Sequence, residues 1–451
     1  MRRRTCVVSW MGVVALAAAM GCGGTVKDVD ATSAGPGGAG GAGGGGSGGA
    51  GAGGSGGGDG PVCDFFLPVG APVVLDPPLD QSALSPKLVR SGLDPKTAVL
   101  AFMGVPVNGP AGALNDIHLR FLLDPWSTWP PVEGSNHVLA DAQGPFVVSE
   151  GAAMEVALLR DTGTGPMPYT VVPAQLMIPK SANLPPDATH AALLRMHPGG
   201  HVLGYGRPHA GNTIELLVGF GRYSGKLPSV EGFTPVGCTK DEVLMDAVPT
   251  EKGTLVAFAS NDDPASASGC TGSLSNAKQV VIARVIDGSA VVAELAASTP
   301  DGPSEIQGLG MAGRSDGAWV AFGRAGWIEA TATIQAQRLD AAGAFVGEPF
   351  FLAGSSDLNP ATLGVGRLND DLVVAWSTGA ETSTRIEVRR LSTWSTGNPE
   401  ATIEETQSVS QPIAVLGSPT ADAVLVAYSV VSEVDQTSRI HLQRFDCGVD
   451  L

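Results

Sequence analysis

Trp319-Val320-Ala321-Phe322 is one of six short apolar segments, each ending in an aromatic residue, that recur along this chain. The other five are Val99-Leu100-Ala101-Phe102, Val202-Leu203-Gly204-Tyr205, Leu255-Val256-Ala257-Phe258, Val373-Val374-Ala375-Trp376 and Leu425-Val426-Ala427-Tyr428. The aromatic positions are separated by 103, 53, 64, 54 and 52 residues. Because the first interval is twice the usual one, a degenerate copy is predicted midway, at Phe146-Val147-Val148-Ser149. A period in this range indicates repeated supersecondary units, here seven of them.

A second segment follows the first in most units and alternates apolar with polar residues, as in Ile334-Gln335-Ala336-Gln337-Arg338-Leu339. Alternation with a period of two is typical of a strand with one packed and one wetter face, whereas the short apolar runs suit strands buried on both faces. Turn residues such as Ser315-Asp316-Gly317 and Asn369-Asp370-Asp371 stand just before the buried strand. Each unit is therefore predicted to be a four-stranded antiparallel sheet.

The repeat resembles the degenerate β-propellers found in many exported bacterial proteins, over residues 61–451. The resemblance implies an all-β fold, a seven-bladed β-propeller of four-stranded antiparallel blades. The Trp-Asp pair of WD40 blades is missing, and Ser315-Asp316-Gly317-Ala318-Trp319 lacks the spacing of sialidase Asp-boxes. Tandem β-sandwiches are the alternative fold.

The two ends of this domain predict how the ring closes. The last unit stops at Arg444-Phe445-Asp446-Cys447 without a fourth strand, while the domain opens with Cys63 and then Gly70-Ala71-Pro72-Val73-Val74-Leu75. The opening segment matches Gly347 to Leu352, the fourth strand of the fifth unit. The N-terminal strand is therefore predicted to complete the last blade, which brings Cys63 close to Cys447.

Cysteine usage agrees with an oxidising compartment. Once Cys6 and Cys22 are set aside, four cysteines remain and allow three pairings. We favour disulfides Cys63 to Cys447 and Cys238 to Cys270, the second joining two connections that emerge on one face of a propeller. Free buried thiols are the alternative.

The N-terminus has the layout of a secretory signal peptide over residues 1–21, with three arginines followed by a short apolar run. That run is shorter than the roughly 20 residues that a membrane-spanning helix needs. Ala19-Met20-Gly21-Cys22 resembles the bacterial lipobox, although Ala19 departs from the usual Leu. The resemblance implies that Cys22 receives the lipid; a plain thiol beside an ordinary cleavage site is the alternative.

Residues 22–60 then form a glycine-rich tether, since 18 of the 26 residues from Gly35 to Gly60 are glycine. As a random coil, this tether spans roughly 35 Å on average. Several acyl chains at Cys22 are expected to make attachment to the membrane permanent, since each buried methylene contributes about 0.8 kcal/mol. Gly23 is not the Asp associated with inner-membrane retention, so the cell envelope, and the outer membrane rather than the inner, is the expected location.

The chain carries a net charge of −17, and removal of Arg2, Arg3 and Arg4 takes it to about −20. An acidic chain repels phosphates, so nucleic acid is not expected as a partner. The domain is expected to be monomeric, with the membrane as a partner through the lipid anchor and an envelope protein or a glycan as ligand.

Few residues in the sequence suggest a metal-binding or cofactor-binding site. The densest polar cluster is His197, His201 and His209 with Arg207, but Pro198-Gly199-Gly200 forbids the helix on which histidines at spacing four would bind a metal. We predict a hairpin there, with no metal and no cofactor. Asp262-Asp263 and Asp370-Asp371 lack calcium-loop spacing and are expected to be turns.

Catalysis has no sequence signature here, since Gly-x-Ser-x-Gly is absent and no cysteine is spare. The sequence therefore favours a non-catalytic binding or scaffolding module. A propeller-type glycan hydrolase or lyase and a structural surface component are the alternatives. If there is a binding site, it is expected on the face that carries the long loops Gly104 to Asp116 and Ser260 to Lys278, unless these are insertions without a role.

Overall fold

The computed structural model places all of its described residues in one compact unit, Asp59–Leu451. It describes residues 65–448 apart from 79, 92–93, 95, 111–112, 149–155, 162–165, 172–189, 198–199, 210–212, 225–226, 262–269, 271–273, 275–276, 287–288, 292–303, 327–330, 381–382, 392–399 and 433–436. The predicted signal peptide, tether and lipidation site, and also Cys63, lie outside the described residues.

Every regular element among these residues is a β-strand, so the predicted all-β class is confirmed. No helix in this part of the chain is long and apolar enough to span a membrane. Three consecutive sheets have four antiparallel strands each: β13 (Met245–Thr250), β14 (Gly253–Ser260), β15 (Gln279–Ile286) and β16 (Ser289–Val291); β17 (Ser304–Arg314), β18 (Gly317–Gly326), β19 (Ala332–Asp340) and β20 (Phe345–Ser355); β21 (Leu358–Leu368), β22 (Asp371–Ala380), β23 (Ser383–Leu391) and β24 (Glu400–Glu405).

Three further sheets complete the described residues. A fourth four-stranded sheet holds β9 (His190–His197), β10 (Gly200–His209), β11 (Thr213–Ser224) and β12 (Leu227–Thr239). A six-stranded sheet holds β3 (Gln81–Arg90), β4 (Thr97–Pro106), β5 (Asn115–Leu123), β6 (Val132–Val148), β7 (Val156–Asp161) and β8 (Pro166–Val171). A five-stranded sheet holds β25 (Val409–Gly417), β26 (Ala423–Val431) and β27 (Ser438–Gly448) together with the N-terminal β1 (Phe65–Pro68) and β2 (Val73–Leu75).

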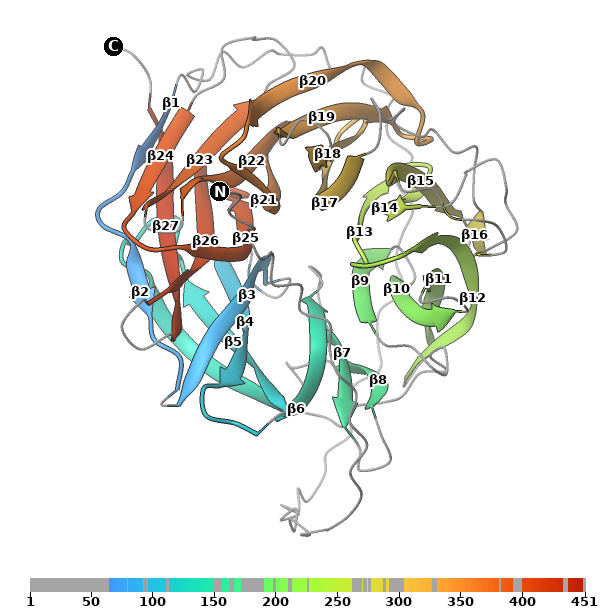
Figure 1. Ribbon diagram of the computed structural model, residues 1–451, viewed down its shortest axis with the longest axis horizontal. Helices are drawn as coiled ribbons and strands as arrows, with labels where there is room; N and C mark the ends of the chain where they lie inside the picture. The colour runs from blue at the N-terminus through green and yellow to red at the C-terminus, as the bar shows by residue number, and fades with distance from the viewer. Residues whose placement is uncertain are drawn as a thin grey trace, which may run out of the picture. The chain divides into compact units, whose positions relative to one another are not determined.

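The first strands of successive sheets contact one another in a cycle around a common centre (Figure 1). The contacts run from β3 to β25, β21, β17, β13, β9 and β6, and β6 also contacts β3. Sheets of four antiparallel strands whose innermost strands meet in this way are the blades of a β-propeller. The described residues therefore form a β-propeller, as the repeat predicted.

The repeated apolar segments form the second strand of their sheets, in β4, β10, β14, β18, β22 and β26. Their aromatic residues are at most 1% exposed, which confirms that these strands are buried on both faces. Five clusters of buried apolar side chains fill interfaces between neighbouring sheets; one, for example, joins Trp319 of β18 to Trp376 of β22. A sixth cluster lies within the six-stranded sheet, between β3–β5 and β6–β7. The predicted turns before β18 and β22 are also present, since Arg314 pairs with Gly317 and Leu368 with Asp371.

The degenerate copy is shifted by one strand relative to its expected position. Phe146 to Val148 lies at the end of β6 and pairs with β7 through Val147 to Ala157. The apolar run that occupies the position of a second strand is Val156-Ala157-Leu158-Leu159 of β7. This run ends on Leu159 instead of an aromatic residue, which is why its sequence did not match the motif.

Strand β6 belongs to two hairpins at once. Its residues up to Ala142 pair with β5, and the residues from Ala142 to Val148 pair with β7. The partner changes at Ala142, and the register of the β6–β7 pairing then shifts between Gln143 and Val147. One long strand therefore links what would otherwise be two separate sheets.

The N-terminal segment pairs with β27, the last strand of the described chain. Val73 to Leu75 pairs with Ile440 to Leu442, and Phe65 to Pro68 pairs with Phe445 to Gly448. The register sets Phe66, which is 3% exposed, opposite Cys447. This places the first described residues on the last sheet.

Candidate functional site

The innermost strands surround a cavity of about 200 Å³ at one end of the propeller axis. Its walls include Lys87 of β3, Phe146 of β6, His190 of β9, Met245 of β13 and Gln307 of β17. Residues of β21 and β25 complete the wall, through Leu363 and Pro412 respectively. The lining therefore combines apolar side chains with a few polar groups.

Two more cavities follow along the same strands. A second, of about 190 Å³, shares Lys87, Met245 and Leu309 with the first. A third, of about 170 Å³, shares Leu88, Val365 and Val415 with the second and ends beside Arg90 and Arg367. These cavities form a central channel, which has Glu242 and His190 at one mouth and two arginines at the other.

Three carboxyl groups and a lysine gather beside the first mouth. Asp241 and Glu242 lie in the connection from β12 to β13, and Glu305 is the second residue of β17. Lys278, which is only 2% exposed, forms an ion pair with Asp241, and Asp241 also shares a hydrogen bond with Glu305. Gln307 donates to Glu305 at 3.2 Å. We call these five residues the mouth cluster.

The three carboxyl groups of the mouth cluster have pKa values that are shifted in different directions. Burial and the hydrogen bond with Asp241 raise the pKa of Glu305, and burial raises the pKa of Glu242. Burial opposes ionisation of Asp241, but the hydrogen bonds from Glu305 and Lys278 outweigh it and lower the pKa of that carboxyl. Asp241 therefore holds the negative charge opposite Lys278, while Glu305 retains its proton more readily.

The pKa of His190, at the same mouth, is lowered by burial, which favours the neutral imidazole. A neutral imidazole carries one donor and one acceptor nitrogen. Together with the Gln307 amide and the Glu305 carboxyl, it gives this mouth hydrogen-bonding groups of both kinds with little net charge.

The two long loops expected to carry recognition lie at this end of the propeller, and one is shorter than expected. Gly104 pairs with Asp116, so β4 and β5 continue further and the connection reduces to residues 107–114. Beside it, Gln81 bridges Asp116 at 2.7 Å and His118 at 2.8 Å. Much of the second loop, residues 262–269 with Asp262 and Asp263, lies outside the described residues.

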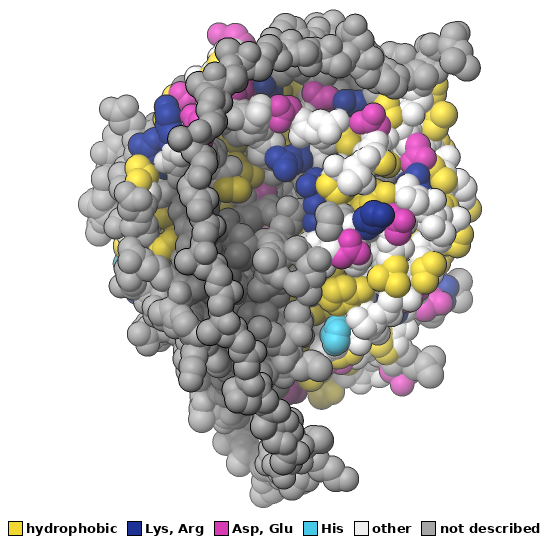
Figure 2. Space-filling model, turned by 180° about the vertical axis from the view of Figure 1, so that it is seen from behind, with side chains coloured by type: hydrophobic (Ala, Val, Ile, Leu, Met, Phe, Trp, Pro, Cys, Tyr) yellow, Lys and Arg dark blue, Asp and Glu magenta, His cyan; other side chains and the backbone are white. Residues whose placement is uncertain are grey.

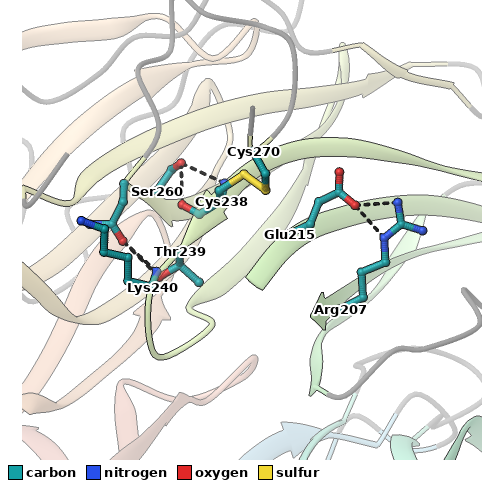
Figure 3. Close-up of a disulfide and its surroundings, with 8 residues drawn as sticks. Arg207, Glu215, Cys238, Thr239, Lys240, Ser260 and Cys270 are labelled. Atoms are coloured by element: carbon teal, nitrogen blue, oxygen red, sulfur yellow. Dashed lines mark hydrogen bonds and ion pairs between the residues drawn. A yellow bond between two sulfur atoms is a disulfide. The ribbon is translucent and has the colours of Figure 1, made fainter. Parts of the chain in front are cut away.

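The disulfide between Cys238 and Cys270 is present and joins β12 to the connection between β14 and β15 (Figure 3). The Ser260 hydroxyl accepts from the Cys238 amide at 3.2 Å and donates to its carbonyl at 3.1 Å. Cys447 is disulfide-bonded as well. The predicted pair Cys238 to Cys270 therefore links two sheets, as the sequence indicated.

The histidine-rich segment forms the expected hairpin of β9 and β10, with His197 opposite Gly200. At the far end of β10 the side chains make contacts that the sequence did not predict. Arg207 forms an ion pair of 2.6 Å with Glu215, which is 5% exposed. Ligand atoms of His209, Glu215 and Cys270 lie within 4.8 Å of one another, a group which the sequence did not single out. Cys270 is disulfide-bonded, so its sulfur is not a thiolate ligand in this state.

The predicted turn at Asp370-Asp371 is confirmed between β21 and β22. The Asp370 carboxylate accepts from the backbone amide of Ser315 at 3.0 Å and from its hydroxyl at 2.5 Å, and Asp371 pairs with Arg390 at 2.6 Å. These carboxylates therefore join neighbouring turns and strands of the propeller.

On the face opposite to that of Figure 1, Lys and Arg side chains lie among Asp and Glu side chains (Figure 2). Apolar and uncharged side chains separate these groups over the described part of that face. The described surface seen from this side is therefore of mixed charge.

No family model matches the chain, and no curated protein matches it. Solved structures with a similar fold include a subtype N11 neuraminidase-like protein of A/flat-faced bat/Peru/033/2010 (H18N11), at 9% identity and a TM-score of 0.41, covering 87% of this chain and 98% of that one. The fungal lectin of Aleuria aurantia has 12% identity and a TM-score of 0.43, covering 73% and 98%. The propeller domain of the Pyrococcus furiosus Trilobed protease has 9% identity and a TM-score of 0.43, covering 80% and 95%.

Proposed function

We propose that this chain is a lipid-anchored, monomeric β-propeller of the cell envelope that binds a neutral glycan at the first mouth of its channel and does not transform it. The observation that carries the proposal is the mouth itself: strands from every sheet converge on an apolar pocket rimmed by polar groups whose charges balance.

We count seven blades in this propeller. Seven innermost strands line the cavity at the first mouth, β3, β6, β9, β13, β17, β21 and β25, together with Met103 of the second strand β4. The six-stranded sheet supplies two of them, because the first part of β6 would be the outer strand of one blade and the last part the inner strand of the next. Seven inner strands agree with the seven repeats of the sequence.

We further propose that the N-terminal strands close the ring and that Cys63 is the partner of Cys447. Pairing of β1 and β2 with β27 supports this closure. Cys63 precedes Phe66, the residue opposite Cys447, by three positions, so the chain between them is short enough for the bond. Cys238 and Cys270 are already bonded to each other and do not compete.

The anchor at Cys22 can be tested by replacing that residue. Radiolabelled fatty acid is expected to enter the wild-type chain, whereas Cys22→Ala should carry no label and should leave the membrane fraction, because the thioether to the lipid cannot form. Fractionation on a density gradient would then locate the labelled wild type, which we expect in the outer membrane. Equal labelling of the two chains would contradict the anchor.

The mouth suits a neutral, hydroxyl-rich ligand. Hydroxyl groups need donors and acceptors in fixed places, which His190, Gln307 and Glu305, whose pKa is raised by burial, supply. Apolar walls such as Met245 and Phe146 can cover the face of a sugar ring. At about 200 Å³ the cavity is smaller than the roughly 300–1,000 Å³ of pockets for whole small molecules, so it fits one terminal unit of a longer chain.

The paired carboxyls Asp241 and Glu305 do not match the arrangement of a glycosidase. A retaining glycosidase holds its two carboxyl groups about 5–5.5 Å apart and an inverting one about 6.5–9.5 Å apart. Asp241 and Glu305 instead share a hydrogen bond with each other, and Asp241 also forms an ion pair with Lys278. The pair leaves no room for a glycosidic bond or a water molecule between the two groups.

Binding can be tested by screening the detergent-solubilised full chain against an array of envelope glycans and measuring the affinity of any glycan retained. Gln307→Ala is expected to weaken binding about tenfold, since one lost hydrogen bond costs about 1 kcal/mol or slightly more. Glu404→Gln is the matched control, because Glu404 lies on the outer strand β24 with its side chain 72% exposed. Release of shorter sugars would favour the hydrolase or lyase, and retention of a protein alone would contradict the glycan.

A further inference from the structure

We propose that reduction of the Cys238 to Cys270 disulfide creates a binding site for one Zn²⁺. The ligands would be Cys238, Cys270, His209 and Glu215. One atom each of His209, Glu215 and Cys270 already lies within 4.8 Å of the others. Two atoms bound to the same tetrahedral zinc ion lie about 3.3–3.8 Å apart, because each is about 2.0–2.3 Å from the metal. Ligand atoms separated by 4.8 Å thus need to approach each other by about 1–1.5 Å.

Strand pairing brings these ligands together. Arg207 of β10 lies opposite Glu215 of β11, and Glu215 lies opposite Cys238 of β12. His209 follows Arg207 by two positions on the same strand and therefore lies on the same face of the sheet. Cys270 comes from the connection of the next sheet, and its Cα lies 5.5 Å from that of Cys238.

Reduction supplies the missing ligands. A dithiol reductant gives two electrons and two protons to the Cys238 to Cys270 bond, which becomes two thiols, while the reductant becomes a disulfide. Zinc binds thiolates, so both thiol protons pass to the solvent when the ion binds. A set of two sulfurs, one imidazole and one carboxylate suits zinc better than the hard cations calcium and magnesium, which prefer oxygen ligands.

The charge of the surroundings fits this ion. Two thiolates and the Glu215 carboxylate contribute −3, and Zn²⁺ with the Arg207 guanidinium contributes +3, so the group as a whole is neutral. Both contacts of Arg207 end on Oε2 of Glu215, which leaves the other oxygen, Oε1, outside the arginine ion pair (Figure 3). Arg207 can therefore orient the carboxylate without displacing the metal. The ion would take over the link between the two sheets that the disulfide provides in the oxidised chain.

The proposal can be tested with Co²⁺ as a spectroscopic probe and with Zn²⁺ in competition against a chromophoric chelator. The full chain, reduced with a dithiol and desalted without oxygen, is expected to bind one Co²⁺ with a thiolate charge-transfer band, while the oxidised chain shows no such band. His209→Ala and Cys270→Ser are each expected to weaken Zn²⁺ binding at least tenfold. His137→Ala, a half-buried histidine on β6 whose ring packs edge-on against Phe121, and Cys447→Ser are the controls and should bind as the wild type does.

Reduction also opens the bond at Cys447, so a second variant avoids the reductant. Cys238→Ala leaves Cys270 as a thiol beside His209 and Glu215 without any reduction, and its circular dichroism reports whether the strands persist. This variant is expected to bind Co²⁺ with one thiolate, and adding Glu215→Gln should abolish the binding. The proposal is overturned if neither the reduced wild type nor Cys238→Ala shows a thiolate band, or if the His209 and Cys270 variants bind as the wild type does.

Discussion

The double variant Cys63→Ala with Cys447→Ala is expected to lose about 5 kcal/mol of the free energy of unfolding, the largest effect that we predict for any bond in this chain. The two cysteines are 384 residues apart in the sequence, since 447 minus 63 is 384. A cross-link that closes so long a loop removes much of the entropy of the unfolded chain, which is the origin of the stabilisation in the chain-entropy model. Denaturant-induced unfolding of the variant and the wild type, both oxidised, measures the difference.

The variant should keep its β-type circular dichroism, because β1 also packs through Phe66 against Phe445 at 6.4 Å between ring centres. Non-reducing peptide mapping provides the direct control. It should recover a Cys63 peptide joined to a Cys447 peptide and a Cys238 peptide joined to a Cys270 peptide. Recovery of Cys447 joined to another cysteine would show that Cys63 does not fasten the last sheet.

Trp376→Ala is expected to cost about 3–5 kcal/mol of the free energy of unfolding, the range for removing a large aromatic side chain from a core. Trp376 is fully buried in the cluster between the sheets of β18 and β22, and the Arg389 guanidinium lies 5.4 Å above its ring. Its removal leaves a cavity lined by apolar side chains such as Leu358 and Leu363, which rigid strands cannot fill. Thermal and denaturant unfolding report the loss.

Phe351→Ala is the matched control, since Phe351 belongs to β20 but its side chain lies in solvent, 66% exposed. Its removal should change the free energy of unfolding by no more than about 0.5 kcal/mol. Trp376→Phe should give an intermediate loss, because part of the ring volume is retained. Equal losses for Trp376→Ala and Phe351→Ala would mean that the repeated aromatic positions do not hold the sheets together.

The fold was predictable because its repeat is a consequence of burial. A strand covered on both faces by neighbouring sheets must be apolar throughout, so segments such as Leu255 to Phe258 are visible as a period in the sequence. Strand β7, whose apolar run does not end on an aromatic residue, shows the limit of this signal. The apolar run of β7 ends on Leu159, whereas Phe146 to Val148, which carries the aromatic residue, ends the preceding strand β6.

The mouth cluster could not have been predicted in the same way. Asp241, Lys278 and Glu305 lie in three different segments, and single charged residues at such positions are ordinary for turns and strand ends. Only the packing of neighbouring sheets brings them into contact. The metal-ligand group has the same origin, because Glu215 and Cys238 are neighbours only through strand pairing. One signal was available: a lysine directly before the apolar strand β15 is expensive to bury without a partner.

The continuity of β6 has a consequence for how the molecule opens. Where two sheets are joined only by a loop, one can fray while the other stays closed, since local opening involves units that share few hydrogen bonds. Strand β6 instead carries the hydrogen bonds of both β5 and β7 on one backbone. Loss of pairing on one side of Ala142 thus weakens the support of the strand on the other side, and the six strands from β3 to β8 should protect their amides from exchange as one cooperative unit.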